Sequence, residues 1–371
     1  MRRLHQLSLR SVVLALAIAS LAGCDRSGRP VVVGVAGPFT TAYGASMRQG
    51  AELAAREVNA NGGIGSRPLE LRFVDDGADP DSALRVAQRL HDAPEVVAVV
   101  GHVNSGAMLN AAAAYERGLP AVATSATSGL ISRLGDWVFR VAPSDSANSV
   151  ELARVAREFD RPVAVLYENE DYGRGLADGF RGALAGSGGH VLTIDPYLPT
   201  TADFRPYLER MRQQGVGVVF VAGLETDAAR IIDQARAIGL EARFLGGDGM
   251  EGLTGMGPAY EGTLVGVLFH PDASPLATAF AAQFREAFGR EADSFAALGY
   301  DATRLIAEAA REAGADRTSI RDHLAGVGRD GRPAYQGVTG TIRFDENGDP
   351  VDKQFSVGVV RGGRIVLGEE S

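Results

Sequence analysis

The residues of this chain that could act as a nucleophile and its base stand together in one short segment. His102 lies three residues before Ser105, a spacing that could suggest a serine hydrolase. No Gly-x-Ser-x-Gly turn surrounds Ser105, so the sequence lacks the sharp bend that exposes such a nucleophile. We therefore interpret His102 as a satisfied polar residue at the end of a strand. Carboxylate pairs such as Asp75–Asp76 are expected to be solvated or to cap helices, not to perform acid–base chemistry.

The sequence gives little support for a phosphate, nucleotide or metal site. A P-loop needs a lysine after its glycine-rich turn, and the only lysine of the chain is Lys353. The segment 247–252 matches the dinucleotide-binding pattern by letter, but Gly255, Gly257 and Pro258 make the segment that follows a poor helix. The six histidines are scattered, and no His-Glu-x-x-His motif occurs. The sequence therefore predicts no metal, no cofactor and no enzyme activity.

The first 23 residues have the features of a secretory signal. Arginines at positions 2, 3 and 10 precede an apolar run from Val12 to Ala19, which is too short to span a membrane. The segment Leu21-Ala22-Gly23-Cys24 resembles a bacterial lipobox, in which the cysteine becomes the acylated amino terminus after cleavage. Because Cys24 is the only cysteine, we predict its lipidation and no disulfide within the chain.

The charge of the chain excludes some partners. Its formal net charge is −9, and removal of the three signal arginines makes the mature chain more acidic still. An acidic chain argues against binding to nucleic acid and against electrostatic docking on a membrane. The mature chain of roughly 350 residues is longer than one core usually holds, so two domains are expected.

Strand-like and helical segments alternate through the mature chain. Six nearly continuous apolar runs predict buried strands of parallel sheets, at residues 31–36, 69–74, 96–100, 162–167, 217–222 and 263–269. Apolar residues at helical spacing predict helices around residues 47–58, 228–238 and 295–309. Gly62 and Gly239 are expected to end two of these helices. This order predicts an α/β fold of two doubly wound parallel-sheet lobes, with a first crossing between the lobes at residues 140–144.

Five segments follow the order of a known family. They read GVAGPFTTAYGASMRQGAELAAREVNANGGI, RPLELRFVDDGADP, VVAVVGHVNSGA, DYGRGLADGF and FLGGDG. In their order and spacing the chain resembles the leucine/isoleucine/valine-binding proteins, which are type I periplasmic binding proteins. The resemblance implies two lobes joined by a three-strand hinge, with the ligand in the cleft between them. After the signal peptide (1–23) and a linker (24–29), it places the first lobe at residues 30–143 plus 271–342 and the second at 144–270 plus 343–371.

The resemblance also assigns an anion-binding end to the cleft. Ser105 corresponds to the serine that takes the ligand carboxylate, and it opens a predicted helix, whose free amides favour an anion. Thr127 matches the threonine that shares this carboxylate. The backbone carbonyl of Ser125 would accept a hydrogen bond from the ligand ammonium.

The remaining ligand contacts are expected from both lobes. Tyr43 and Tyr172 match aromatic residues that line the cleft from opposite sides. Asp248 matches the acidic residue that pairs with the ammonium, and Gly247 and Gly249 would leave its approach unobstructed.

Two positions depart from the family pattern. Many relatives have a disulfide near the cleft of the first lobe, where this chain has Ala78 and Asn104, so we expect that loop to be held by packing. Amino-acid binders commonly place an aromatic residue where this chain has Leu224, which leaves the identity of the ligand open. Branched-chain and other amino acids, short amides, urea and aromatic acids all remain candidates.

The resemblance implies the extracytoplasmic solute-binding component of an ABC importer, which passes a small zwitterionic ligand, expected to be an aliphatic amino acid, to a membrane permease. The protein would act as a monomer, anchored by lipid to the outer face of the cytoplasmic membrane, where Asp25 after the anchor resembles a retention signal. A sensory protein whose closure is read by a partner is the alternative from another class. An enzyme on the same scaffold is a third.

Overall fold

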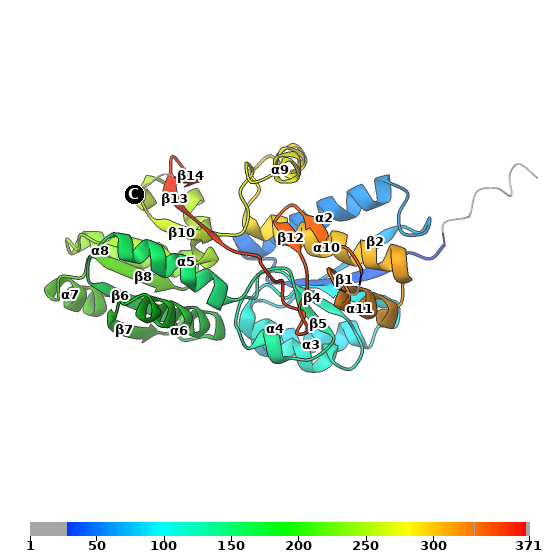
Figure 1. Cartoon of the computed structure of the whole chain (residues 1–371), viewed down its shortest axis with the longest axis horizontal. Coiled ribbons are helices and arrows are strands. Elements are labelled where there is room, and N and C mark those ends of the chain that lie inside the picture. The colour runs from blue at the N-terminus through cyan, green and yellow to red at the C-terminus, as the bar shows by residue number, and fades with distance from the viewer. Residues whose placement is uncertain (1–27, 330, 369–371) are drawn as a thin grey trace, which may run out of the picture.

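The computed structural model describes residues 28–329 and 331–368, which form two lobes side by side (Figure 1). The signal segment and Cys24 lie outside the described residues. No helix within the described ranges is both long and apolar enough to cross a membrane.

A five-stranded parallel sheet forms the centre of the first lobe, in the order β2-β1-β3-β4-β5. Its strands are β1 (Val31–Gly37), β2 (Leu69–Asp75), β3 (Val96–Val100), β4 (Ala121–Ala123) and β5 (Val138–Arg140). Helices α2 (Ala42–Ala60), α10 (Ser294–Ala313) and α11 (Arg317–Ala325) share one core with it, and α3 (Pro80–His91) and α4 (Ser105–Tyr115) share another. Alternate residues of β1 enter the two cores, Val33 one and Val32 the other, because successive side chains of a strand point to opposite faces.

The second lobe is built around a seven-stranded sheet in the order β14-β13-β10-β9-β8-β6-β7. Its parallel strands are β6 (Val163–Glu168), β7 (Val191–Tyr197), β8 (Val218–Ala222), β9 (Arg243–Gly246) and β10 (Leu264–Val267), and β13 (Ser356–Arg361) and β14 (Arg364–Leu367) add antiparallel. Helices α5 (Asp145–Glu158) and α6 (Asp171–Gly186) pack on one face, and α7 (Arg205–Gln213) and α8 (Glu225–Ala237) on the other. The rings of Phe180 and Phe220 stack between α6 and the sheet with centroids 3.8 Å apart.

The predicted α/β architecture is confirmed. All six predicted strands and all three predicted helices are present, and Gly62 and Gly239 follow helix ends with the positive φ values of 91° and 72° that glycine tolerates. The segment 248–256 forms 3₁₀ turns (η2), so no α-helix follows the glycine-rich stretch at 247–252.

The chain passes between the lobes three times, after β5, after β10 and before β13. Between the last two crossings it adds α9 (Pro275–Phe288), α10 and α11 to the first lobe, followed by a hairpin of β11 (Tyr335–Gly337) and β12 (Gly340–Ile342). Residues 343–355, which the sequence analysis assigns to the second lobe, contact the first. Phe344 and Phe355 lie in its core, and Lys353 Nζ donates to the carbonyl of Val141 at 2.8 Å. The last crossing therefore follows Phe355.

Helices α2 and α10 approach closely where glycines face the partner helix. A Cβ on Gly50 would overlap the carbonyl oxygen of Ala296, a backbone atom that cannot move aside. We expect Gly50→Ala to lower the free energy of unfolding by about 1–3 kcal/mol through overpacking. The matched control is Gly182→Ala on α6, where no atom lies within 4 Å of the added methyl group. Chemical unfolding of both variants checks this, and equal stability of the two would show that α2 and α10 can separate without cost.

Candidate functional site

A cavity lies between the two lobes. Its lining residues are Tyr43, Val103, Asn104, Ser105, Ser125 and Phe295 from the first lobe, and Tyr172, Leu224, Asp248 and Gly249 from the second. All except Phe295 follow the carboxyl end of a parallel strand, where ligands of open α/β sheets bind. Both lobes therefore supply walls of the cavity.

Ser105 and Ser125 form a hydroxyl-rich end of the cavity. Ser105 is the first residue of α4, and its Oγ accepts a hydrogen bond from the backbone N–H of Ser128 at 3.2 Å. The hydroxyl proton of Ser105 remains available for a ligand. The start of α4 adds the positive end of a helix dipole, so this end suits an anion.

Thr127 lies behind this wall. Its side chain is wholly buried, it is not among the cavity-lining residues, and its Oγ1 makes no hydrogen bond to a described residue. Its carbonyl accepts from the backbone N–H of Asp145 at 2.8 Å and from Arg140 Nη1 at 3.1 Å. The structure thus places Thr127 beside the predicted site, with a hydroxyl that still lacks a partner.

Asp248 and Tyr172 meet at the second-lobe side of the cavity. Tyr172 OH donates to Asp248 Oδ1 at 3.0 Å and accepts from the backbone N–H of Gly249 at 3.1 Å. Burial raises the pKa of Asp248 to about 6, against the hydrogen bond from Tyr172, which lowers it. A Cβ on Gly247 would come within 2.7 Å of the Tyr172 hydroxyl, so only glycine permits this close contact.

Apolar side chains also line the cavity. The rings of Tyr43 and Phe295 pack with centroids 5.4 Å apart, and Val103 continues the surface. Leu224, from the second lobe, packs against the core of the first lobe. The cavity therefore combines apolar walls with hydroxyl and carboxyl groups.

The neighbouring loops are joined by a buried hydrogen-bond chain. His102 Nδ1 lies 2.6 Å from Asp76 Oδ2, and His102 Nε2 lies 2.8 Å from Tyr115 OH, with all three side chains buried. Asp76 Oδ1 also accepts from the backbone N–H of Ala78 at 2.9 Å. His102 is thus the satisfied polar residue that the sequence predicts. The expectation that packing alone holds the loop near Ala78 and Asn104 is incomplete, because this polar chain connects the two loops.

Sequence reasoning missed two buried polar residues at the start of α5. Neither oxygen of Asp145, and neither polar side-chain atom of Asn148, has a hydrogen-bond partner among the described residues. Burial raises the pKa of Asp145 to about 8, the nearby Thr127 hydroxyl lowers it, and the charge of Asp248 raises it further. A signal was present, since Asp145 directly follows the predicted first crossing between the lobes.

No positively charged side chain of the described residues lines the cavity near the two buried aspartates. Neither lysine nor arginine is among the residues that line the cavity, while Asp145 and Asp248 are both buried. Arg140 lies close enough to lower the pKa of Asp145, but its guanidinium hydrogen-bonds elsewhere, to Asp349 among others. A cationic group entering this region would meet the carboxylate of Asp248, with the carboxyl of Asp145, which its raised pKa keeps largely protonated at neutral pH, close by.

Two α/β lobes that close on a polar cavity at their strand ends define the class of two-lobed solute-binding proteins. The chain belongs to the periplasmic binding protein family, whose model matches residues 30–364. It is 32% identical over 330 residues to the Leu/Ile/Val-binding protein homolog 1 of Brucella suis, covering 86% of this chain and 87% of that protein. It is 32% identical over 358 residues to an amino acid binding protein of Pseudomonas aeruginosa, covering 92% and 93%.

Solved structures show the same fold. The branched-chain amino acid transporter substrate-binding protein LivJ of Streptococcus pneumoniae, in complex with isoleucine, matches with a TM-score of 0.83 at 28% identity. The match covers 91% of this chain and 97% of LivJ. The fold class and the family that the sequence predicts are therefore confirmed.

The buried carboxyl of Asp145 should destabilise the unliganded protein. Its folded-state pKa of about 8 is above the ordinary value, so the folded state holds a proton that the unfolded state loses, and stability falls as pH rises from about 4 to about 8. Asp145→Asn removes this titration. We expect it to stabilise the unliganded protein at pH 8 by about 1–3 kcal/mol, and by less at pH 4.

Chemical unfolding of wild type and variant at both pH values measures this difference. Asp178→Asn is the control, because Asp178 lies on α6 with 70% of its side chain exposed. An Asp145→Asn effect that is the same at both pH values would contradict a raised pKa.

Proposed function

We propose that this protein is the extracytoplasmic solute-binding component of an ABC importer, and that it binds an α-amino acid with an aliphatic or otherwise bulky side chain. The observation that carries the proposal is the set of groups that line the cavity. Hydroxyls and a helix start from the first lobe, a carboxylate from the second, and apolar side chains from both lobes all border it. The names of the related binding proteins and the isoleucine in the LivJ structure support the same ligand class.

In this proposal each end of the cavity takes one charge of the ligand. Ser105 and Thr127 hold the carboxylate, and the unpartnered hydroxyl of Thr127 is consistent with a donor kept for the ligand. The carbonyl of Ser125 and the carboxylate of Asp248 take the ammonium. An uncharged apolar molecule would leave these buried polar groups of the site without partners. That would cost several kcal/mol, so such molecules are excluded.

The wall of the cavity favours an amino acid with an apolar side chain. Tyr43, Tyr172, Leu224 and Phe295 would enclose the side chain. We expect an affinity in the micromolar range or better, about −8 kcal/mol or stronger.

The ligand class is tested by calorimetry with L-leucine and two analogues that each lack one charged group, 4-methylpentanoic acid and leucinamide. We expect each analogue to bind at least about 100-fold more weakly, because it leaves a buried group unpaired. Asp248→Asn should weaken leucine binding at least about tenfold. If the plain acid binds as well as leucine, or if Asp248→Asn leaves the affinity unchanged, the zwitterion assignment is wrong.

The same site predicts a pH dependence. The pKa of Asp248 is about 6 without ligand, and only its charged form attracts an ammonium. Leucine affinity should therefore fall about fourfold between pH 7.5 and pH 5.5 if Asp248 alone titrates, with proton release on binding. Asp248→Asn should remove this dependence, and a dependence that persists in the variant would assign it to another group.

We also propose that Cys24 carries the lipid anchor, although it lies outside the described residues. The acidic body offers no electrostatic attraction to a membrane, so anchoring would depend on acyl chains. Cys24→Ser should move the protein from the membrane fraction to the soluble fraction on cell fractionation. A variant that stays in the membrane fraction while processed normally would contradict lipidation.

A further inference from the structure

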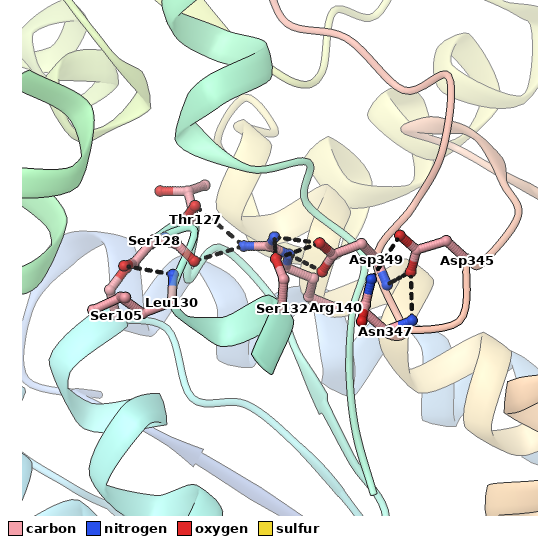
Figure 2. A network of polar contacts seen from close by, with 9 residues as sticks. All are labelled: Ser105, Thr127, Ser128, Leu130, Ser132, Arg140, Asp345, Asn347 and Asp349. Carbon is pink, nitrogen blue, oxygen red and sulfur yellow. Dashed lines mark hydrogen bonds and ion pairs between the residues drawn. The ribbon is translucent and has the colours of Figure 1, made fainter. Parts of the chain in front are cut away.

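A buried arginine connects the ligand-binding loop of the first lobe to a turn that precedes the third crossing between the lobes (Figure 2). Arg140, the last residue of β5, is completely buried. Its Nη1 donates to the carbonyls of Thr127 at 3.1 Å and Ser128 at 2.9 Å. Its Nη2 donates to Ser132 Oγ at 2.8 Å. One side chain thus contacts three residues of the segment that follows β4.

The charge of Arg140 is matched by one carboxylate in a two-point geometry. Arg140 Nε lies 2.6 Å from Asp349 Oδ1, and Nη2 lies 2.8 Å from Asp349 Oδ2. Such a two-point pair balances the charge of the guanidinium and also fixes its orientation. Ser132 Oγ also donates to Asp349 Oδ2 at 2.5 Å, so the pair is held from a second side.

The carboxylate partner is itself fixed by a turn of the chain. Asp345 Oδ1 accepts from the backbone N–H groups of Asn347 at 2.8 Å and Asp349 at 3.0 Å. The backbone N–H of Arg140 donates to the carbonyl of Gly348 at 3.1 Å. This turn lies between Phe344 and Phe355, directly before the chain enters the second lobe.

The other end of the network reaches the cavity. The Ser128 N–H donates to Oγ of Ser105, the cavity residue that we propose to bind the ligand carboxylate (Figure 2). Residues 124–130 contain no helix or strand, so their peptide groups depend on such contacts for orientation. Two of those peptide carbonyls are oriented by the same guanidinium.

We propose that Arg140 is a positioning residue of the ligand site: it holds the peptide groups of Thr127 and Ser128 against the Asp345–Asp349 turn, so that the Ser105 hydroxyl and the Thr127 side chain keep their binding geometry. A lysine cannot replace it, because an ammonium cannot contact both carbonyls and both carboxylate oxygens in a fixed plane. The claim that this geometry serves ligand binding rests on the proposed function.

The first test is amide hydrogen exchange of the unliganded protein, which requires no ligand. In Arg140→Lys and Asp349→Asn we expect exchange at least tenfold faster in residues 124–132 and 343–351, with α6 unchanged. The control is Arg343→Gln, since Arg343 is close to the same turn in the sequence but forms an exposed pair with Asp352. Wild-type exchange rates in both segments of Arg140→Lys and Asp349→Asn would overturn the proposal.

The second test is a double-mutant cycle on L-leucine affinity that combines Arg140→Lys with Ser105→Ala. If Arg140 positions Ser105, the loss caused by Ser105→Ala should be at least threefold smaller in the Arg140→Lys background than in wild type. A residue that only stabilises the fold would give losses that multiply, and that result would overturn the positioning role. If wild type binds no amino acid, the proposed function fails, and the exchange experiment still decides the role of Arg140.

Discussion

A charge that leaves water needs a partner inside the protein, and the two sides of the cleft meet this requirement in opposite ways. Arg140 in the first lobe is fully buried and has every neighbouring acceptor in place. Asp145 and Asp248 are buried in the second lobe without a cation among the residues that line the cavity. Satisfied polar networks are rigid, whereas buried carboxylates without counter-charge favour any state that supplies one. The proposed ligand ammonium would supply it, so the closed form gains most when the ligand is present.

The chain brings these groups together through the strand ends. Parallel strands place all their carboxyl ends on one edge of each sheet, and the two edges face each other across the cavity. The side chains that touch the cavity therefore come from short loops on rigid supports. The His102–Asp76 and Arg140–Asp349 pairs hold two of these loops in place without lining the cavity. Precise placement of the ligand contacts thus depends on residues that the ligand never touches.

Continuous apolar runs predicted five strands that are largely buried, and also β2, most of whose residues are only half-buried. The patterns missed β4 and β5, which have three residues each, the antiparallel strands β11 to β14, and β7, an edge strand whose exposed and partly buried residues alternate. The family motifs located the cavity residues at strand ends, but not Phe295, which arrives from a helix far along the chain. The motifs also could not reveal the pairing of Arg140 with Asp349. These two residues are far apart in the sequence and meet only when the chain returns to the first lobe before its third crossing. For the same reason, the sequence analysis placed the last boundary between the lobes at residue 343, whereas the chain stays with the first lobe up to Phe355.

Lys353, the only lysine of the chain, is buried just before the third crossing, where it donates to the carbonyl of Val141 and to Thr339 Oγ1. Burial lowers its pKa to about 8, although the charge of Asp301 raises it. A protease that cuts only after lysine therefore has a single target bond, enclosed where the lobes join. Its cleavage would report the opening of that junction, and the folded body offers no other lysine to obscure the signal.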